Sequence, residues 1–110
     1  MSFSTLEKSL MKDISEYRKD IEIVESLNRL MKNKDFNLVI SKGYLVDETL
    51  RLVKRKCSVS GEEEIKLIRL LDSISSLQNY FDVLRENAEI AKKSLNEAEL
   101  TLEDISGELA

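Results

Sequence analysis

The residue types that most often carry enzyme chemistry are scarce in this 110-residue chain. It has no histidine, the side chain used most often as a general base near neutral pH and as a metal ligand. Its single cysteine, Cys57, supplies only one of the roughly four ligands of a structural zinc site. No base or orienting group accompanies that thiol as nucleophilic catalysis requires. We therefore expect an inert or buried thiol, and no catalytic, cofactor-binding or metal-binding residue.

The charged clusters and the glycines have structural explanations. Glu62, Glu63 and Glu64 fit the first turn of a helix, where the helix dipole favours carboxylates. Residues 54–56 are the only basic run, and no interleaved aromatic residue is available to stack on bases. The three glycines are isolated at positions 43, 61 and 107, too far apart for a phosphate-binding loop. The chain is predicted not to be an enzyme, and its pattern disfavours nucleic-acid binding.

Composition indicates a single helical domain over residues 1–110. Charged residues make up 35% of the chain and aromatic residues 5%, and proline is absent, a profile that favours helices over sheets with many turns. One cysteine excludes an internal disulfide. The N-terminal residues lack the apolar core of a signal peptide, and no run reaches the length of a membrane span. We therefore expect neither a secreted nor a membrane protein.

An apolar heptad runs without interruption through the C-terminal half. Its steps alternate between three and four residues, and neither proline nor glycine interrupts it. Such a repeat predicts one long helix over residues 62–106, with a seam that must pack against another helix. The seam consists of Leu67, Leu70, Ile74, Leu77, Phe81, Leu84, Ala88, Ala91, Leu95, Ala98, Leu102 and Ile105.

A second stripe predicts a first helix over residues 5–33. Ser4 and Glu7 have the spacing of a capping box. Asn28 falls on the stripe, where a buried asparagine would fix the register of a coiled coil. In the alternative, Leu27 and Leu30 take over the seam and Asn28 is exposed. The stripe consists of Leu10, Ile14, Tyr17, Ile21, Val24, Asn28 and Met31.

Two short helices are expected between the long ones. After a break that begins at Asn33, Asp35 is predicted to cap a helix over residues 36–42. Gly43 would end that helix in a left-handed conformation.

The second short helix is predicted over residues 47–56, capped near Asp47. Residues 57–61 then form a loop. Ser60 and Glu63 have the spacing of another capping box, which would open the long helix.

These lengths predict an extended antiparallel helical hairpin, a coiled-coil-like stalk with a small helical head. The first helix would run beside residues 78–106, while residues 34–77 form the head. Ala88, Ala91 and Ala98 would let the stalk helices approach closely. The alternative is a three-helix up-down-up bundle. The residues that flank the long seam lack the complementary charged rows of a parallel dimer, which favours the hairpin.

The net charge of −4 is concentrated at one end of the chain. Residues 85–110 carry three basic and seven acidic side chains, whereas residues 1–84 are balanced. This end would repel nucleic acid and anionic lipid. It is either an acidic solvated tail or a contact for a basic partner surface.

The candidate interface residues are aromatic residues of the head and seam residues of the stalk. In the alternative interpretation, the aromatic residues, together with Phe36, build the head core. In the functional one, Tyr44 or Tyr80 is an exposed anchor. The candidates are Tyr44, Tyr80, Phe81, Ala88, Ala91, Leu95, Ala98 and Leu102.

One set of residues over positions 27–95 resembles a known family, the small helical proteins that tailed bacteriophages encode near their head and packaging genes. The resemblance rests on Leu30, Asn33, Asp35-Phe36, Val39-Ile40, Gly43-Tyr44-Leu45, Glu48, Arg51-Leu52-Val53, Leu77 and Tyr80-Phe81.

This resemblance implies a structural or assembly role and transfers no catalytic residue. The chain would bind a head, portal or tail protein through its apolar helix faces, with or without self-association, and would be found in the virion or the host cytoplasm. The alternative is a soluble adaptor that binds a host protein during infection.

Overall fold

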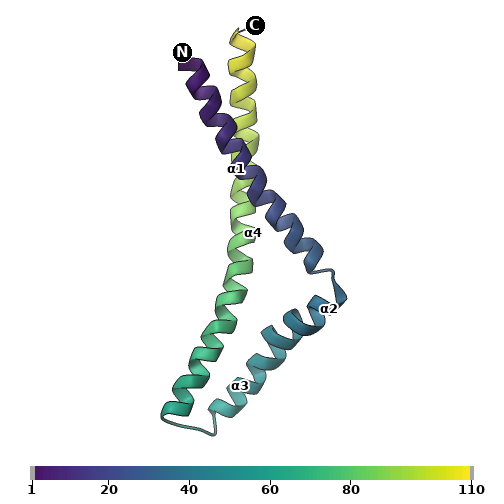
Figure 1. Ribbon diagram of the computed structural model, residues 1–110, viewed down its shortest axis with the longest axis vertical. Helices are drawn as coiled ribbons and strands as arrows, with labels where there is room; N and C mark the ends of the chain where they lie inside the picture. The colour runs from purple at the N-terminus through teal and green to yellow at the C-terminus, as the bar shows by residue number, and fades with distance from the viewer. Residues whose placement is uncertain (1, 110) are drawn as a thin grey trace. The chain divides into compact units, whose positions relative to one another are not determined.

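The computed structural model describes the backbone of residues 2–109 and the side chains of residues 5–107 (Figure 1). Within that range the chain is helical and contains no strand. The predicted all-α class is therefore confirmed. The elements in chain order are α1 (Ser2–Leu30), α2 (Lys34–Phe36), the π-helix η1 (Asn37–Glu48), α3 (Thr49–Lys56) and α4 (Glu62–Leu109).

The chain divides into two compact units. The paired-helix unit consists of residues 2–26 of α1 and 84–109 of α4. The head unit consists of residues 27–83, and therefore contains the end of α1, the middle helices and the first part of α4. The division corresponds to the stalk and head expected from the sequence, with the boundary several residues into the predicted stalk.

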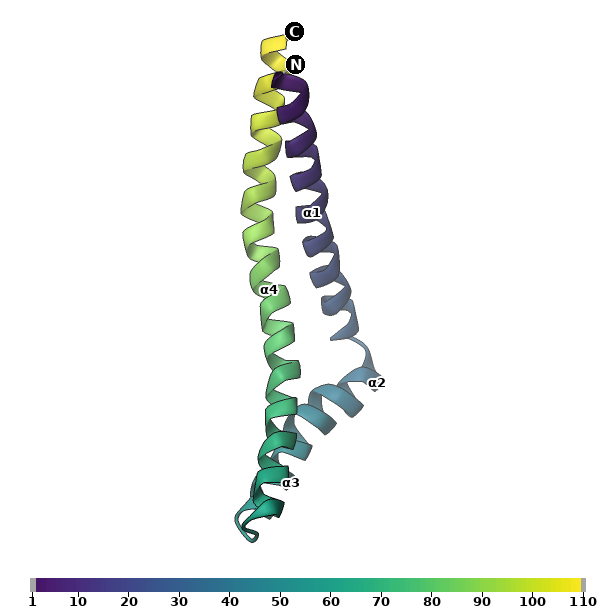
Figure 2. The ribbon, with the colours of Figure 1, turned by 60° about the vertical axis from the view of Figure 1, so that its left-hand side comes forward.

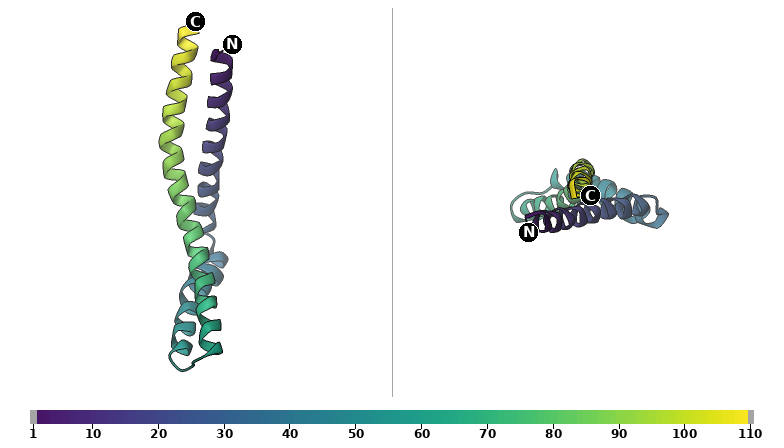
Figure 3. Two further views of the ribbon diagram at one scale, coloured as in Figure 1. Left: turned by 90° about the vertical axis from the view of Figure 1, so that its left-hand side faces the viewer. Right: turned by 90° about the horizontal axis from the view of Figure 1, so that it is seen from above.

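In the paired-helix unit, α1 and the second half of α4 run antiparallel. Figures 2 and 3 show α1 beginning beside the end of α4, and Arg18 of α1 reaches Glu99 of α4. The predicted hairpin is confirmed, and the three-helix alternative is not adopted. The helices bury Ile14, Val24, Ala88, Ala91, Ala98 and Ile105. Small alanine side chains let α4 present a flat seam to the larger residues of α1.

The predicted seams are correct apart from two positions. Leu70 is 44% exposed, and Leu71 packs against the head core in its place. Leu71 is four residues after Leu67 and three before Ile74, so it lies on the same helix face. Asn28 is exposed while Leu27 is buried. Leu27 therefore occupies the seam in place of Asn28, as the alternative expected, but Leu30, which that alternative also placed in the seam, is 42% exposed.

A short turn follows α1, and Asn33, not the predicted Asp35, caps the next helix, α2. Helix α1 spans Ser2–Leu30 rather than the predicted 5–33, and the side chain of Ser4 lies outside the described residues. Asn33 has an extended backbone, and its side chain accepts a hydrogen bond from the Phe36 N–H at 2.9 Å. The predicted cap at Asp35 is wrong, because Asn33 already has the extended conformation and the three-residue spacing of an N-cap.

The two short helices predicted over 36–42 and 47–56 form a single helical run, and η1 is its central part. Gly43 does not end a helix, because among residues 2–109 only Gly61 has a positive φ among the glycines. A π-helix is wider than an α-helix, with hydrogen bonds between residues five apart. A Cβ added at Gly43 would lie 2.9 Å from the carbonyl oxygen of Leu38, five residues earlier. Glycine at position 43 therefore permits close packing inside the π-helix.

Side chains connect the start of η1 to the turn after α1. The Asn37 amide donates to the Met31 carbonyl oxygen at 2.6 Å, and the Ser41 hydroxyl donates to Asn37 Oδ1 at 2.9 Å. Within the run, the Thr49 hydroxyl donates to the Leu45 carbonyl oxygen at 2.9 Å. The Asn37 and Thr49 bonds thus engage the backbone carbonyl groups of Met31 and Leu45, and the Ser41 bond holds the Asn37 amide in place.

The head core forms where α3 meets the first part of α4. Leu52, which is 1% exposed, packs with Leu67 and Ile74. The half-buried residues around them are Tyr44, Leu45, Val59 and Leu71. Leu52 is the most completely buried large side chain of the described residues, so this cluster is the centre of the head unit.

The loop between α3 and α4 is spanned by an ion pair. Arg55 Nη2 lies 3.1 Å from Glu63 Oε1. Gly61 has φ +68°, and its carbonyl oxygen accepts the Ile65 N–H at 3.2 Å. The predicted capping box of Ser60 and Glu63 is wrong, because the left-handed Gly61 occupies the N-cap position and Glu63 pairs with Arg55.

We predict opposite effects for two Gly→Ala substitutions in helices. Gly43→Ala is expected to lower the free energy of unfolding by about 1–3 kcal/mol, because its Cβ would press on a backbone carbonyl. Gly107→Ala, which meets no atom within 4 Å, should be neutral or gain up to about 1 kcal/mol. Urea unfolding followed by circular dichroism measures both. Stabilisation by Gly43→Ala would contradict the π-helical geometry.

Ala91→Leu is expected to destabilise the paired-helix unit by about 1–3 kcal/mol through overpacking. Ala91 is buried in the seam. Asn96→Leu adds a similar side chain at an exposed position of α4 and serves as the control. The melting temperatures of the two variants should differ by several degrees. Equal melting temperatures would show that position 91 tolerates bulk.

Candidate interaction surfaces

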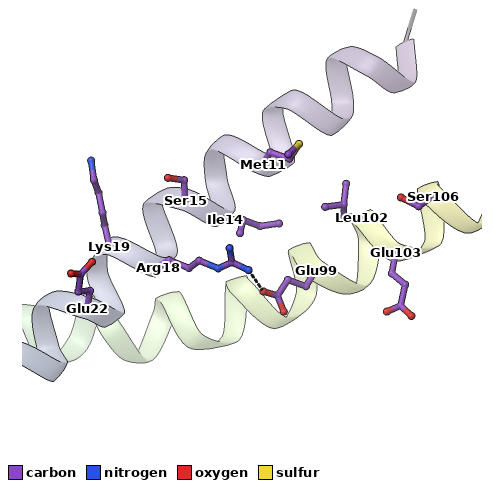
Figure 4. A pocket seen from close by; sticks show the side chains of 10 residues that line it. All are labelled: Met11, Ile14, Ser15, Arg18, Lys19, Glu22, Glu99, Leu102, Glu103 and Ser106. Atoms are coloured by element: carbon purple, nitrogen blue, oxygen red, sulfur yellow. Dashed lines mark hydrogen bonds and ion pairs between the residues drawn. The ribbon is translucent and has the colours of Figure 1, made fainter.

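The paired-helix unit has an open groove between α1 and α4, with a volume of about 700 Å³. Figure 4 shows Ile14 of α1 and Leu102 of α4 pointing toward one another across its floor. Met11 lies on the same side, one turn before Ile14. The lining residues are Met11, Ile14, Ser15, Arg18, Lys19, Glu22, Glu99, Leu102, Glu103 and Ser106.

The groove has an apolar floor that is only partly covered. Ile14 is buried and Leu102 is half-buried, but Met11 is 59% exposed. A methionine side chain is flexible and polarizable and adapts to partners of different shape. The floor can therefore accept an apolar side chain from another molecule.

Charged side chains surround this floor. Arg18 Nη2 and Glu99 Oε1 form an ion pair at 3.0 Å that bridges the two helices. The Arg18 side chain is 66% exposed and the Glu99 side chain 47%. An exposed pair of this kind contributes about 0–1 kcal/mol. In Figure 4, Lys19 and Glu103 point away from the floor. The ion pair therefore shapes one end of the groove more than it stabilises the unit.

The aromatic candidates divide between core and surface. Phe81 is buried and meets Phe36 edge to face, with ring centroids 6.4 Å apart. Tyr44 is half-buried against the head core. Tyr80 is 55% exposed, and its ring lies 6.2 Å from that of Phe81. Phe36, Tyr44 and Phe81 therefore belong to the head core. Of these four aromatic residues, Tyr80 is the one that is exposed enough to act as an interface anchor.

The stalk candidates are mainly packing residues. Ala88, Ala91 and Ala98 are buried inside the paired-helix unit, so their side chains face the neighbouring helix. Leu95 and Leu102 are half-buried, and only Leu102 lines the groove. Of the five stalk candidates, Leu102 is therefore the one that a partner could reach through the groove.

Sequence reasoning missed Met11 as a groove residue. It directly follows Leu10, a member of the first stripe, but does not itself belong to that stripe. An apolar residue beside a seam position widens the apolar face of a helix, and this was the signal that could have identified Met11.

Two further features bear on the expected chemistry. Cys57 is exposed in the loop after α3, so the buried alternative for this thiol is wrong. Within the described residues, no group of three or more potential metal-ligand side chains lies together. In the same range, no helix is both long and apolar enough to span a membrane.

Comparisons with family models, with curated proteins and with solved structures find no match for this chain. Its function must therefore be inferred from its own residues and surfaces.

We predict that apolar packing, and not the ion pair, stabilises the groove. Ile14→Ala should lower the free energy of unfolding by about 2–5 kcal/mol, because it leaves a cavity at the floor. Glu99→Gln removes the ion pair while keeping the side-chain shape and should cost less than about 1 kcal/mol. Denaturant titration of the two variants measures the difference. A larger loss of unfolding free energy for Glu99→Gln than for Ile14→Ala would show that the ion pair is the main stabilising interaction.

Proposed function

We propose that this chain is a non-enzymatic structural or assembly protein of a tailed bacteriophage, and that it binds a head, portal or tail protein. The observation that carries the binding role is the groove with its exposed Met11. The phage assignment rests on the resemblance of residues 27–95 and on no other observation. The absence of histidine from the chain also favours binding over general acid–base catalysis.

The partner would insert an apolar side chain, or a short row of them on a helix, between Met11 and Leu102. This mode is helix-in-groove recognition, in which apolar anchors supply affinity and a charged rim supplies orientation. Burial of the exposed thioether is worth about 25 cal/mol for each Å² of apolar surface removed from water. The charged side chains around the floor, such as Lys19 and Glu103, would set the register of the partner.

A second candidate function is a soluble adaptor that binds a host protein. It is favoured by the acidic excess of residues 85–107, which carry six acidic and three basic side chains. A basic host surface would be attracted to this segment, and its binding would weaken as salt increases. The groove is not required for this alternative.

Met11→Glu is expected to abolish capture of a phage structural protein by the tagged chain. The substitution places a charge in the apolar groove without disturbing a buried residue. Ile23→Glu is the matched control, because Ile23 is also exposed on α1 but does not line the groove. Pull-down from infected cells with mass spectrometry measures the captured protein. Equal capture by both variants would show that the groove is not the binding site.

Mass spectrometry of purified phage particles separates the two candidate functions. A virion component should be present at a fixed copy number per particle, and an assembly factor should be present on procapsids. Absence from both, together with co-purification of one host protein, would favour the adaptor and contradict the structural role.

A further inference from the structure

The helical run of α2, η1 and α3 has an exposed stripe whose members recur every four residues. We define the basic stripe as Leu38, Lys42, Val46, Leu50 and Lys54, all of which are exposed. Leu38, for example, is 62% exposed. Val39 and Val53, also exposed, lie next to the stripe in sequence. Tyr44, Leu45 and Leu52 of the same run pack against the head core instead.

The π-helix is the reason that these five residues share one face. In an α-helix of 3.6 residues per turn, each four-residue step rotates about 40°, so Leu38 and Lys54 would lie about 160° apart. A π-helix has more residues per turn because its hydrogen bonds join residues five apart, and the same step rotates the opposite way. Since η1 covers Asn37–Glu48 and α3 follows, the two rotations compensate.

The stripe lies on a segment with a positive charge. Residues 34–56 contain six basic and three acidic side chains, a net charge of +3. Among the neighbouring groups, Arg51 pairs with Glu48 and Arg55 pairs with Glu63. Lys42 and Lys54 are the second and the last residue of the stripe itself.

A second exposed stripe lies on α4 in the paired-helix unit. We define the acidic stripe as Glu86, Ile90, Lys93, Glu97, Leu100 and Asp104, all exposed. The spacing alternates between four and three residues, so the six lie on one face of an α-helix. Ile90 and Leu100 are 63% and 53% exposed. Residues 85–107 have a net charge of −3.

The two stripes complement each other in composition. Each combines exposed aliphatic side chains with charged ones, and the net charges of the two segments, +3 and −3, are equal and opposite. The basic stripe spans 17 residues and the acidic stripe 19. Lys93 is the one residue of the acidic stripe whose charge has the same sign as the basic stripe, and it lies between the carboxylates of Glu86 and Glu97.

We propose that the basic stripe docks on the acidic stripe of a second copy of this chain. Aliphatic contacts of Val46 and Leu50 with Ile90 and Leu100 provide burial, and the lysines and carboxylates set orientation. Each copy carries both stripes, so one type of contact is sufficient for association. This self-association is independent of the phage assignment and does not use the groove, so either can fail without the other.

The experiment is a reciprocal charge exchange on the full chain. Variant one is Lys42→Glu/Lys54→Glu, and variant two is Glu86→Lys/Glu97→Lys. Sedimentation of the wild type at low salt should show concentration-dependent association that weakens as salt increases. Each variant alone should associate at least tenfold more weakly, because its two stripes then have like charge. A mixture of the two should regain association, because the facing stripes are again opposite in sign.

Two matched control variants have the same net charges as the two stripe variants but leave both stripes unchanged. Lys8→Glu/Lys12→Glu and Glu16→Lys/Glu25→Lys change exposed residues of α1. Each control alone should associate like the wild type, and mixing should add nothing. Circular dichroism verifies that every variant is folded.

Three results would overturn the proposal. They are a wild type that stays monomeric at low salt, stripe variants that associate like the wild type, and a mixture that fails to regain association. Binding of the basic stripe only to an unrelated acidic helix, or only within one chain, would appear as the first result.

Discussion

The fold depends on the burial of apolar side chains along helix seams. Every buried side chain among residues 5–107 is apolar. The described ion pairs, such as Arg18–Glu99 and Arg55–Glu63, lie at exposed positions, where each contributes little. Seam complementarity must therefore determine which helices meet. In the paired-helix unit this is achieved by small residues on α4 facing larger ones on α1, and in the head unit by Leu52 between Leu67 and Ile74.

This dependence has a consequence for the middle of the chain. The run from Lys34 to Lys56 has to keep Tyr44, Leu45 and Leu52 directed at the same core. Leu45 and Leu52 are seven residues apart, a separation that an α-helix already keeps on one face. The exposed residues Leu38, Val46 and Leu50 are instead separated by multiples of four, and the wider turns of η1 keep them together on another face. The π-helix is therefore needed for the exposed row, whereas the spacing of Leu45 and Leu52 accounts for their shared core.

The sequence predicted the features that depend on a regular period. The heptad of α4 identified the residues that are buried, and the length of the first helix indicated its antiparallel neighbour. The loop at 57–61 was also correct. These predictions succeed because apolar periodicity over many residues reports directly on burial.

The failures come from local signals that two structures can satisfy. Gly43 is compatible with a helix end and with a close approach inside a π-helix, and only the position of the Leu38 carbonyl distinguishes them. Asn33 and Asp35 are both good capping residues, and the backbone conformation selects the first. Of the candidate interface residues, the alanines were correct for packing but are too buried to reach a partner. A heptad repeat identifies the apolar seam of a helix, but it does not indicate whether a helix of the same chain or of another protein packs against that seam.

The same reasoning explains why exposed aliphatic residues are tolerated on this protein. Isolated exposed apolar side chains are common on protein surfaces, whereas large continuous patches promote association. Here Lys42 interrupts the row between Leu38 and Val46, and Glu97 stands between Ile90 and Leu100. Each row is therefore apolar enough to gain from docking and charged enough to remain hydrated alone. Because the net charges of the two stripes have opposite signs, like stripes repel and unlike stripes attract. Charge patterning of this kind gives directionality to contacts that aliphatic side chains alone would leave unspecific.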